Sequence, residues 1–259
     1  MNLAEEEFDR LLEDLANDIW KAGQHFNLHY NLRKAVKDYN RVFNEANAFW
    51  SLTIESNLDS CMFRLCRLYE TEKSALHLHN WLVLIKKNVH LFEPTKFKER
   101  LKKNPYVDSL ANSGVQPDVK QLEKDLHDTS MNNPLVRRLY MLRCNVYAHK
   151  NAKGAAKGKN WLKDYPFNYD EIESLIEKAF EILNRYSSLF KATSFSKQLI
   201  GDNDYKTVLK FMKESIDRRL AAHQADFDST TERLAKAEQE ALNAQTKKSK
   251  NPKPHLRNS

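Results

Sequence analysis

Scarcity of glycine is the feature that most restricts how this chain can fold. The sequence holds five glycines among 259 residues, whereas an average composition, at about 7% glycine, would supply more than three times as many. Tight hairpins, bulged strands and phosphate-binding loops all need backbone positions with φ > 0, which glycine provides. No two of the glycines are spaced as in a dinucleotide-binding or P-loop motif. The composition therefore favours a helical protein and excludes those two classes of enzyme.

Apolar residues recur every three or four positions through most of the chain, which predicts amphipathic helices. We find no internal repeat and no alternating pattern typical of a strand, so the predicted fold is all-α, a helical bundle with long helices and a C-terminal helical extension. The expected helices span Ala4 to about Gly23, residues 31–68, residues 74–94 with Ser74 as the cap, short pieces within 94–113, residues 118–127, Pro134 (capped by Asn133) to residues 149–152, residues 168–189 with an Asn168–Glu171 capping box, and Asp204 past Leu242.

The pattern predicts three parts along the chain. Residues 1–195 form the helical domain, residues 196–246 a helical extension, and residues 247–259 a basic, disordered tail. The second half of the last helix is mostly polar, so we expect it either to project from the domain or to pack on a partner. One interpretation of the protein is accordingly a coiled adaptor built on this helix.

Positive charge is concentrated in two short segments. The formal net charge is +7, and residues 150–163 and residues 247–259 each contribute +5 without any acidic residue. The rest of the chain is therefore slightly acidic. Basic segments of this kind attract polyanions, although a lysine-rich tail often serves only solubility.

Cysteine and histidine spacing argues against disulfides and metal centres. The three cysteines are Cys61, Cys66 and Cys144, an odd number in helix-like surroundings, which indicates a reduced, cytoplasmic protein. His77 and His79 are two residues apart and would point in opposite directions from one helix. We therefore expect no metal and no cofactor. No apolar run approaches the ~20 residues that span a bilayer, so no membrane association is expected.

The most informative motif lies at the end of the helix that begins at Pro134. Arg143 is followed six residues later by His149, at the start of the first basic segment. This Arg-x-(four to six)-His arrangement resembles the signature of the HEPN superfamily, whose catalytic members are metal-independent ribonucleases. Over residues 5–192 the chain is similar to the abortive-infection U branch of that superfamily, in four ordered segments: FWSLTIESNLDSCMFRLCRLYE, SALHLHNWLVLIKKNVHLF, LRCNVYAHKN and NYDEIESLIEKAFEILNRYSSLF.

One position departs from the family pattern, and helix geometry adds a constraint. The family often has Asn, Asp or His directly after the arginine, whereas this chain has Cys144 there and Asn145 one place later. On a straight helix Arg143 and His149 lie about 120° apart and do not share a face. They converge either if the helix distorts at its C-terminal end or if a second subunit completes the site. The resemblance implies the second arrangement, a homodimer with two motifs lining one cleft.

The resemblance implies a cytoplasmic prokaryotic endoribonuclease of phage defence (abortive infection) or of a toxin–antitoxin pair. RNA is then the substrate, and an antitoxin or regulatory protein is a further partner. His149 would take the proton from a ribose 2′-OH and Arg143 would stabilise the phosphorane, leaving a 2′,3′-cyclic phosphate and a 5′-OH. Asn145 would hold the imidazole tautomer, and Tyr147 would bind phosphate or stack on a base. The RNA-binding lysines are Lys150, Lys153, Lys157 and Lys159.

A non-catalytic interpretation stays open beside this one. A HEPN module without activity would use Arg143 and His149 to bind a nucleotide, to contact a protein or to stabilise a dimer. A helix-terminal histidine often serves only the helix dipole, and a nearby arginine often pairs with a surface acid. Glu55 and Asp59 could face the same cleft, but a solvated helix face is the simpler interpretation.

Overall fold

The fold was analysed in a computed structural model, which describes residues 3–147, 151–198, 201 and 203–250, with side chains up to residue 244. Helices and turns account for this part of the chain, and no strand is present in it. The prediction of an all-α fold is confirmed. The chain divides into two compact units, one of residues 1–36 and 47–202 and the other of residues 37–46 and 203–259. The predicted boundaries at residues 195 and 246 stay a prediction.

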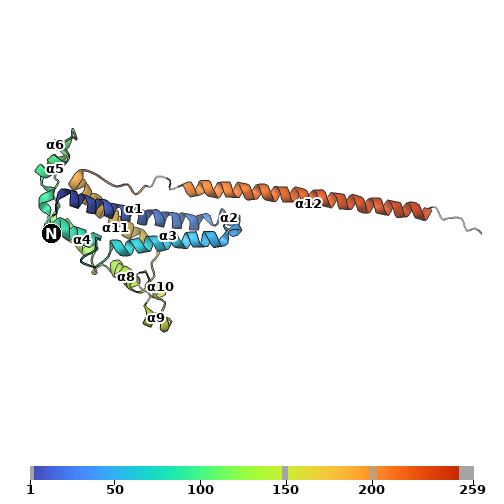
Figure 1. Cartoon of the computed structure of the whole chain (residues 1–259), viewed down its shortest axis with the longest axis horizontal. Coiled ribbons are helices and arrows are strands. Elements are labelled where there is room, and N and C mark those ends of the chain that lie inside the picture. Colours follow the sequence, from blue (N-terminus) through green and yellow to red (C-terminus); the bar gives the residue numbers. More distant parts are fainter. Residues whose placement is uncertain (1–2, 148–150, 199–200, 202, 251–259) are drawn as a thin grey trace, which may run out of the picture. The chain divides into compact units, whose positions relative to one another are not determined.

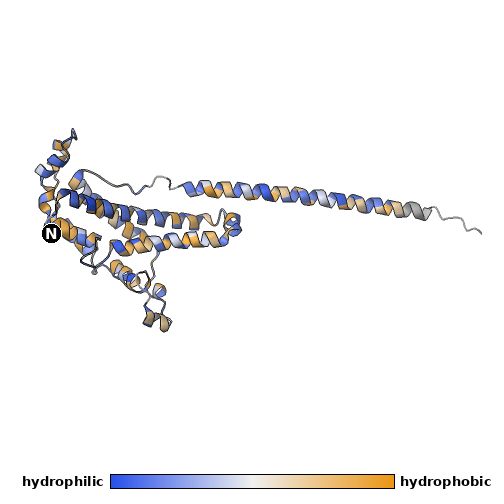
Figure 2. Cartoon of the chain, viewed as in Figure 1, coloured by the Kyte–Doolittle hydropathy of each residue, from blue (hydrophilic) through white to orange (hydrophobic). Residues whose placement is uncertain are grey.

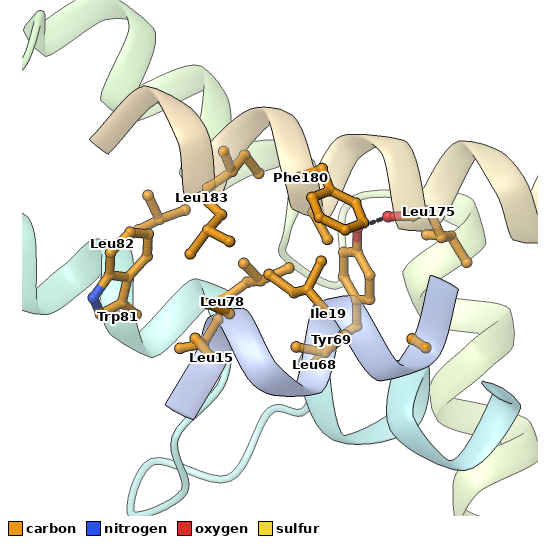
Figure 3. Close-up of a cluster of buried hydrophobic side chains, with 14 of the residues drawn as sticks. Leu15, Ile19, Leu68, Tyr69, Leu78, Trp81, Leu82, Leu175, Phe180 and Leu183 are labelled. Carbon is orange, nitrogen blue, oxygen red and sulfur yellow. Dashed lines mark hydrogen bonds between the residues drawn. The ribbon is translucent and has the colours of Figure 1, made fainter. Parts of the chain in front are cut away.

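The first unit is built around three long helices that pack on one another. These are α1 (Glu5–Ala35), α3 (Asn47–Leu68) and α11 (Tyr169–Lys191), which run side by side in Figure 1. Their apolar faces meet α4 (Leu78–Lys87) in a common core that includes Ile19, Trp81 and Phe180, all fully or almost fully buried (Figure 3). The hydroxyl of Tyr69, at the end of α3, donates a 2.7 Å hydrogen bond to the carbonyl of Leu175 on α11. The end of α3 is therefore fixed to α11.

Two predicted helix boundaries are wrong. The first helix continues to Ala35 rather than stopping near Gly23, and the predicted helix over residues 31–68 is split between α1, α2 (Asn40–Glu45) and α3. Gly23 does not end the helix because it serves packing: a Cβ there would lie 3.6 Å from Phe180 and 3.7 Å from Ile176 on α11. The sequence pattern did not reveal the breaks between α1, α2 and α3, because the short helix α2 also has buried apolar residues and so continues the periodicity.

Local capping patterns mark most of the other helix starts. Asp118, Asn133 and Asn168 cap α7 (Val119–Asp128), α8 (Pro134–Leu142) and α11, and the predicted Asn168–Glu171 capping box is present. The cap of α4 is His77 rather than Ser74, because the His77 imidazole accepts the backbone N–H of Asn80. The segment between α4 and α7 holds η1 (Val89–Phe92), α5 (Pro94–Arg100) and α6 (Val107–Asn112).

A buried ion pair joins α7 to α11. Asp125 is 1% exposed, pairs with Arg185, and accepts hydrogen bonds of 2.9 Å from the Tyr186 hydroxyl and from the Gln121 side chain. Both carboxylate oxygens are therefore satisfied, which is the condition for keeping a charge inside a core. The C-terminal end of α7, where the connection to α8 begins, is therefore fixed to α11.

The second unit consists of α2 and α12 (Asp204–Lys250), and the predicted last helix from Asp204 past Leu242 is confirmed. Arg219 of α12 pairs with Glu45, and Leu209 and Ile216 are buried. Beyond this part, α12 is mainly polar with separate apolar positions (Figure 2). None of the helices in the described part of the chain is long and apolar enough to cross a membrane.

Candidate functional site

The predicted motif lies on a distorted turn of helix. α8 ends at Leu142, and Arg143–Tyr147 form a π-helical turn, η2. Such wide turns close hydrogen bonds from residue i to i+5, are rare, and occur frequently at functional sites. The helix is therefore distorted at its C-terminal end, which is one of the two routes by which Arg143 and His149 were expected to converge. His149 and Lys150 themselves lie outside the described residues.

The guanidinium of Arg143 is oriented by a buried carboxylate. Its Nε forms an ion pair with Glu70, whose side chain is 7% exposed against 30% for Arg143. The other oxygen of Glu70 accepts the backbone N–H of Thr71 at 2.9 Å. Since the pair uses Nε, and the described residues offer no hydrogen bond to the two terminal amino groups, these remain as donors for a planar anion such as phosphate.

Glu70 was not identified from the sequence. It lies 73 positions before Arg143, and ion pairs between distant residues leave no local pattern. A buried acidic residue directly after the apolar end of a helix is the signal that could have suggested it, because such a charge needs a partner.

Asn145 connects the motif turn to the basic segment that follows it. Its amide donates to the carbonyl of Met141 at 2.7 Å, and its oxygen accepts from the Asn151 side chain at 2.8 Å. The residue is 8% exposed. Asn145 thus stabilises the π-helical turn and holds Asn151, at the start of α9, beside it.

Cys144 and Tyr147 lie on the same turn in different surroundings. A hydrogen bond between the Tyr140 hydroxyl and the half-buried Cys144 raises the pKa of Tyr140. Burial raises the pKa of the Tyr147 hydroxyl, and the nearby Asp59 carboxylate adds to this. Tyr147 is therefore neutral and keeps a proton to donate. Glu55 and Asp59 are both exposed on α3, and Asp59 lies near enough to the motif turn to act on Tyr147.

The basic segment lies between two of the predicted helices and is itself partly helical. It holds two short helices, α9 (Ala152–Ala156) and α10 (Trp161–Asp164), each started by an asparagine whose side chain accepts a backbone N–H. Gly154 lies inside α9 and packs closely against Trp161. A Cβ at this position would be 3.0 Å from the indole nitrogen, so a larger residue would crowd the ring. The interval between the predicted helices that end near residue 152 and begin at residue 168 is therefore partly helical.

A cavity of about 590 Å³ lies between the motif turn and this segment, lined by Asn145, Val146, Asn151 and residues of the stretch 155–162. Lys153, Lys157 and Lys159 are exposed. The ammonium of Lys159 lies 3.8 Å from the centre of the Trp161 ring. The arrangement places cations and an aromatic ring beside the motif, a combination that suits a nucleic-acid backbone and its bases.

A second cavity, of about 560 Å³, lies on the Glu70 side and is lined also by His77, His79, Lys73 and Lys87. Both nitrogens of His77 are used, by the Glu72 carbonyl at 3.0 Å and the Asn80 N–H at 3.2 Å, and burial lowers its pKa. His77 is therefore a neutral structural residue. Among the contacts of the described chain, His79 bonds only through Nδ1, which lies 3.1 Å from the Leu126 carbonyl and 3.4 Å from the Thr129 hydroxyl.

Metal ligation is not supported by this part of the molecule. The described residues contain no group of three or more His, Cys, Asp or Glu side chains that could hold a metal ion. His77 is the cap of α4 rather than a residue within it, so the two neighbouring histidines do line one cavity although they lie two residues apart.

The all-α domain and its arginine-bearing motif turn at the end of a helix fit the class of HEPN-type helical domains. The profile of one family in this class, HEPN_AbiU2, described as AbiU2, matches residues 5–211. The chain belongs to this family and is an abortive-infection-related HEPN domain protein. No curated protein and no solved structure matches it.

Proposed function

We propose that the protein is a metal-independent endoribonuclease of a prokaryotic abortive-infection or toxin–antitoxin system. The observation that carries this proposal is the ion pair between Arg143, on the π-helical turn, and Glu70, which follows α3. A buried carboxylate holds the guanidinium in place while its two terminal amino groups stay available. The exposed lysines and the cavity beside Trp161 supply an approach for a polyanion.

The reaction is an internal transesterification. His149 takes the proton from a ribose 2′-OH, the 2′-oxygen bonds to phosphorus, and the bond from phosphorus to the 5′-oxygen breaks. Arg143 neutralises the charge that builds on the non-bridging oxygens. A protonated imidazole returns a proton to the leaving 5′-oxygen, so the products are a 2′,3′-cyclic phosphate and a 5′-OH.

The need for both a base and an acid favours a homodimer. Two copies of the motif around a two-fold axis bring two imidazoles and two guanidinium groups to one cleft, because an isologous interface repeats every contact. Each subunit then contributes its own Arg143–Glu70 pair to the shared cleft. An antitoxin or regulatory protein would act by covering this cleft or by separating the copies.

The test compares RNA cleavage by the full chain and by four variants. Arg143→Ala and His149→Ala are expected to abolish cleavage, whereas Arg137→Ala and His127→Ala, changes of the same type at exposed positions, should leave it unaltered. His149→Ala should keep RNA affinity within a few-fold, since its role is proton transfer. EDTA should have no effect, and the products should carry a cyclic phosphate. Loss of activity in EDTA with recovery in Mg²⁺ would contradict the proposed chemistry.

The second candidate function is a non-catalytic HEPN module that binds a nucleotide. The cavity beside Glu70 favours it, because Lys73, Lys87 and the unused nitrogen of His79 border a space of about 560 Å³. This candidate predicts that RNA is never cut while a nucleotide binds with an affinity that falls in His79→Ala. Cleavage that depends on His149 would exclude it.

A further inference from the structure

Much of α12 is a long helix without tertiary support. Residues 218–244 are all exposed, although helices in proteins owe most of their stability to the packing of an apolar face. Four large apolar residues in this stretch, Leu220, Phe227, Leu234 and Leu242, are 43%, 66%, 63% and 58% exposed. Leu220 and Phe227 border a shallow, open hollow between side chains of α12 itself.

The first three of these residues follow the seven-residue repeat of a coiled coil, whereas Leu242 lies eight residues after Leu234 and outside that row. Leu220, Phe227 and Leu234 are seven residues apart, and His223, Thr230 and Ala237 each lie three residues further on. Together they form the a and d positions of successive heptads, the rows that face a partner helix. The buried Leu209 and Ile216 continue the d row toward the N-terminus of α12. These a and d positions are called the seam below; its d row is thus buried near the N-terminus of α12, and both rows are exposed further along the helix.

We propose that α12 pairs with α12 of a second copy of the chain as an antiparallel coiled coil. In this orientation a positions of one helix face d positions of the other. With residues 228 and 229 at the centre, Leu220 faces Ala237, Phe227 faces Thr230 and Leu234 faces His223. Every layer then combines a large apolar residue with a smaller or polar one, so the layers are of similar size. A parallel pair would instead put phenylalanine against phenylalanine and alanine against alanine.

The charges beside the seam select the same orientation and register. The g positions read Arg219, Asp226, Arg233 and Glu240, with alternating sign. In the antiparallel register above, Asp226 faces Arg233 and Arg219 faces Glu240 of the second copy, so each g–g contact is attractive. A shift of one heptad in one direction places Asp226 against Asp226 and Arg219 against Arg233. A shift in the other direction places Arg233 against Arg233.

Asp226 and Arg233 have no ion pair within the described chain and can contact each other directly, whereas Arg219 pairs with Glu45 and has to leave that pair to face Glu240. A like-charge pair, Asp217 with Glu238, falls on the other flank of the seam. Asp217 is already neutralised by Lys213, 2.7 Å away, which weakens that repulsion. In a parallel pair, g positions of one helix face e positions of the other. Arg233 then attracts Glu238, but Arg219 and Asp226 face uncharged side chains, so only one of these three contacts is attractive.

The first test is sedimentation equilibrium of the full chain and of two matched variants. Phe227→Glu places a charge in the seam, and Phe211→Glu makes the same change on the opposite face of α12, where Phe211 is 64% exposed. We expect Phe227→Glu to weaken self-association by about tenfold or more and Phe211→Glu to leave it within about threefold of wild type. Association through the motif turn would persist in both variants as a separate step. Equal association of the two variants, or a monomeric wild type, would overturn the proposal.

The second test exchanges charges and separates the two orientations. Arg233→Glu should weaken the association, because it places a second carboxylate opposite Asp226. Adding Asp226→Arg should restore it to within about threefold, since the pair is then reversed rather than broken. In a parallel pair Asp226 does not face Arg233, so the second change would restore nothing. Failure of this rescue, with helicity unchanged by circular dichroism, would exclude the antiparallel pairing.

Discussion

At the scale of single residues, the direction of the Arg143 guanidinium depends on Glu70. The carboxylate is almost completely buried, and in the described part of the chain its polar contacts are the guanidinium and the Thr71 N–H. The same pair that stabilises the fold therefore also positions the cation of the motif. The sequence identified Arg143 through its spacing from His149, but Glu70 is separated from the motif by several helices of the fold.

Replacing Glu70 by glutamine should separate charge from shape. Glu70→Gln keeps the size and the acceptor for Thr71 but removes the negative charge opposite Arg143. We expect the free energy of unfolding to fall by roughly 1–3 kcal/mol and RNA cleavage to fall with it, because the guanidinium loses its orienting partner. Urea unfolding measures the first effect. Glu55→Gln, at an exposed position of α3, is the control, and equal stability of the two variants would contradict the role given to Glu70.

At the scale of elements, local signals predicted the helices well where a polar cap satisfies the backbone. Asn133 with Pro134 and the Asn168–Glu171 box mark the starts of α8 and α11 because capping is a contact within four residues. The predicted helix end at Gly23 was wrong for the opposite reason. Gly23, like Gly154 in α9, allows a close approach to a side chain from another helix or turn, and such contacts are invisible in the local pattern.

Order in the basic segment has a consequence for RNA binding. Lys153, Lys157 and Lys159 lie on or next to α9 and are exposed, so they form a fixed cluster of charge beside the motif turn. Reversing all three to Glu should weaken RNA affinity and reduce the log–log salt slope by roughly two units, at ~0.7 per phosphate contact on a single strand. Filter binding at several salt concentrations measures both quantities.

The control for this prediction has the same change in net charge at other exposed sites. Lys102, Lys103 and Lys120 are exposed residues of the first unit that lie outside the basic segment. Their reversal to Glu should leave the salt slope within about half a unit of the wild-type value, because release of counterions depends on local phosphate contacts. If both triple variants lower the slope equally, α9 has no special part in binding.

At the scale of the whole molecule, the core contains ionisable groups that folding keeps neutral. Burial raises the pKa of the Cys61 and Cys66 thiols to about 12, and it raises the pKa of the Tyr69 and Tyr186 hydroxyls as well. These residues lie on or next to α3 and on α11, the helices that form the centre of the first unit. Alkaline pH therefore acts on the core itself rather than on one site.

The sign of the effect follows from proton binding in the two states. The Cys61 thiol ionises near its ordinary pKa of about 8.5 in the unfolded chain but stays protonated when folded, so above that pH the folded state binds more protons. Stability should thus fall as the pH rises, by up to about 1.4 kcal/mol per pH unit for each such group. Urea unfolding at several values between about pH 8 and pH 11 measures the slope. Cys61→Ala lowers stability at every pH by opening space in the core, but it also removes one titrating group. Its slope should therefore be shallower than that of the wild type, and parallel profiles would show that the Cys61 thiol is not kept neutral by folding.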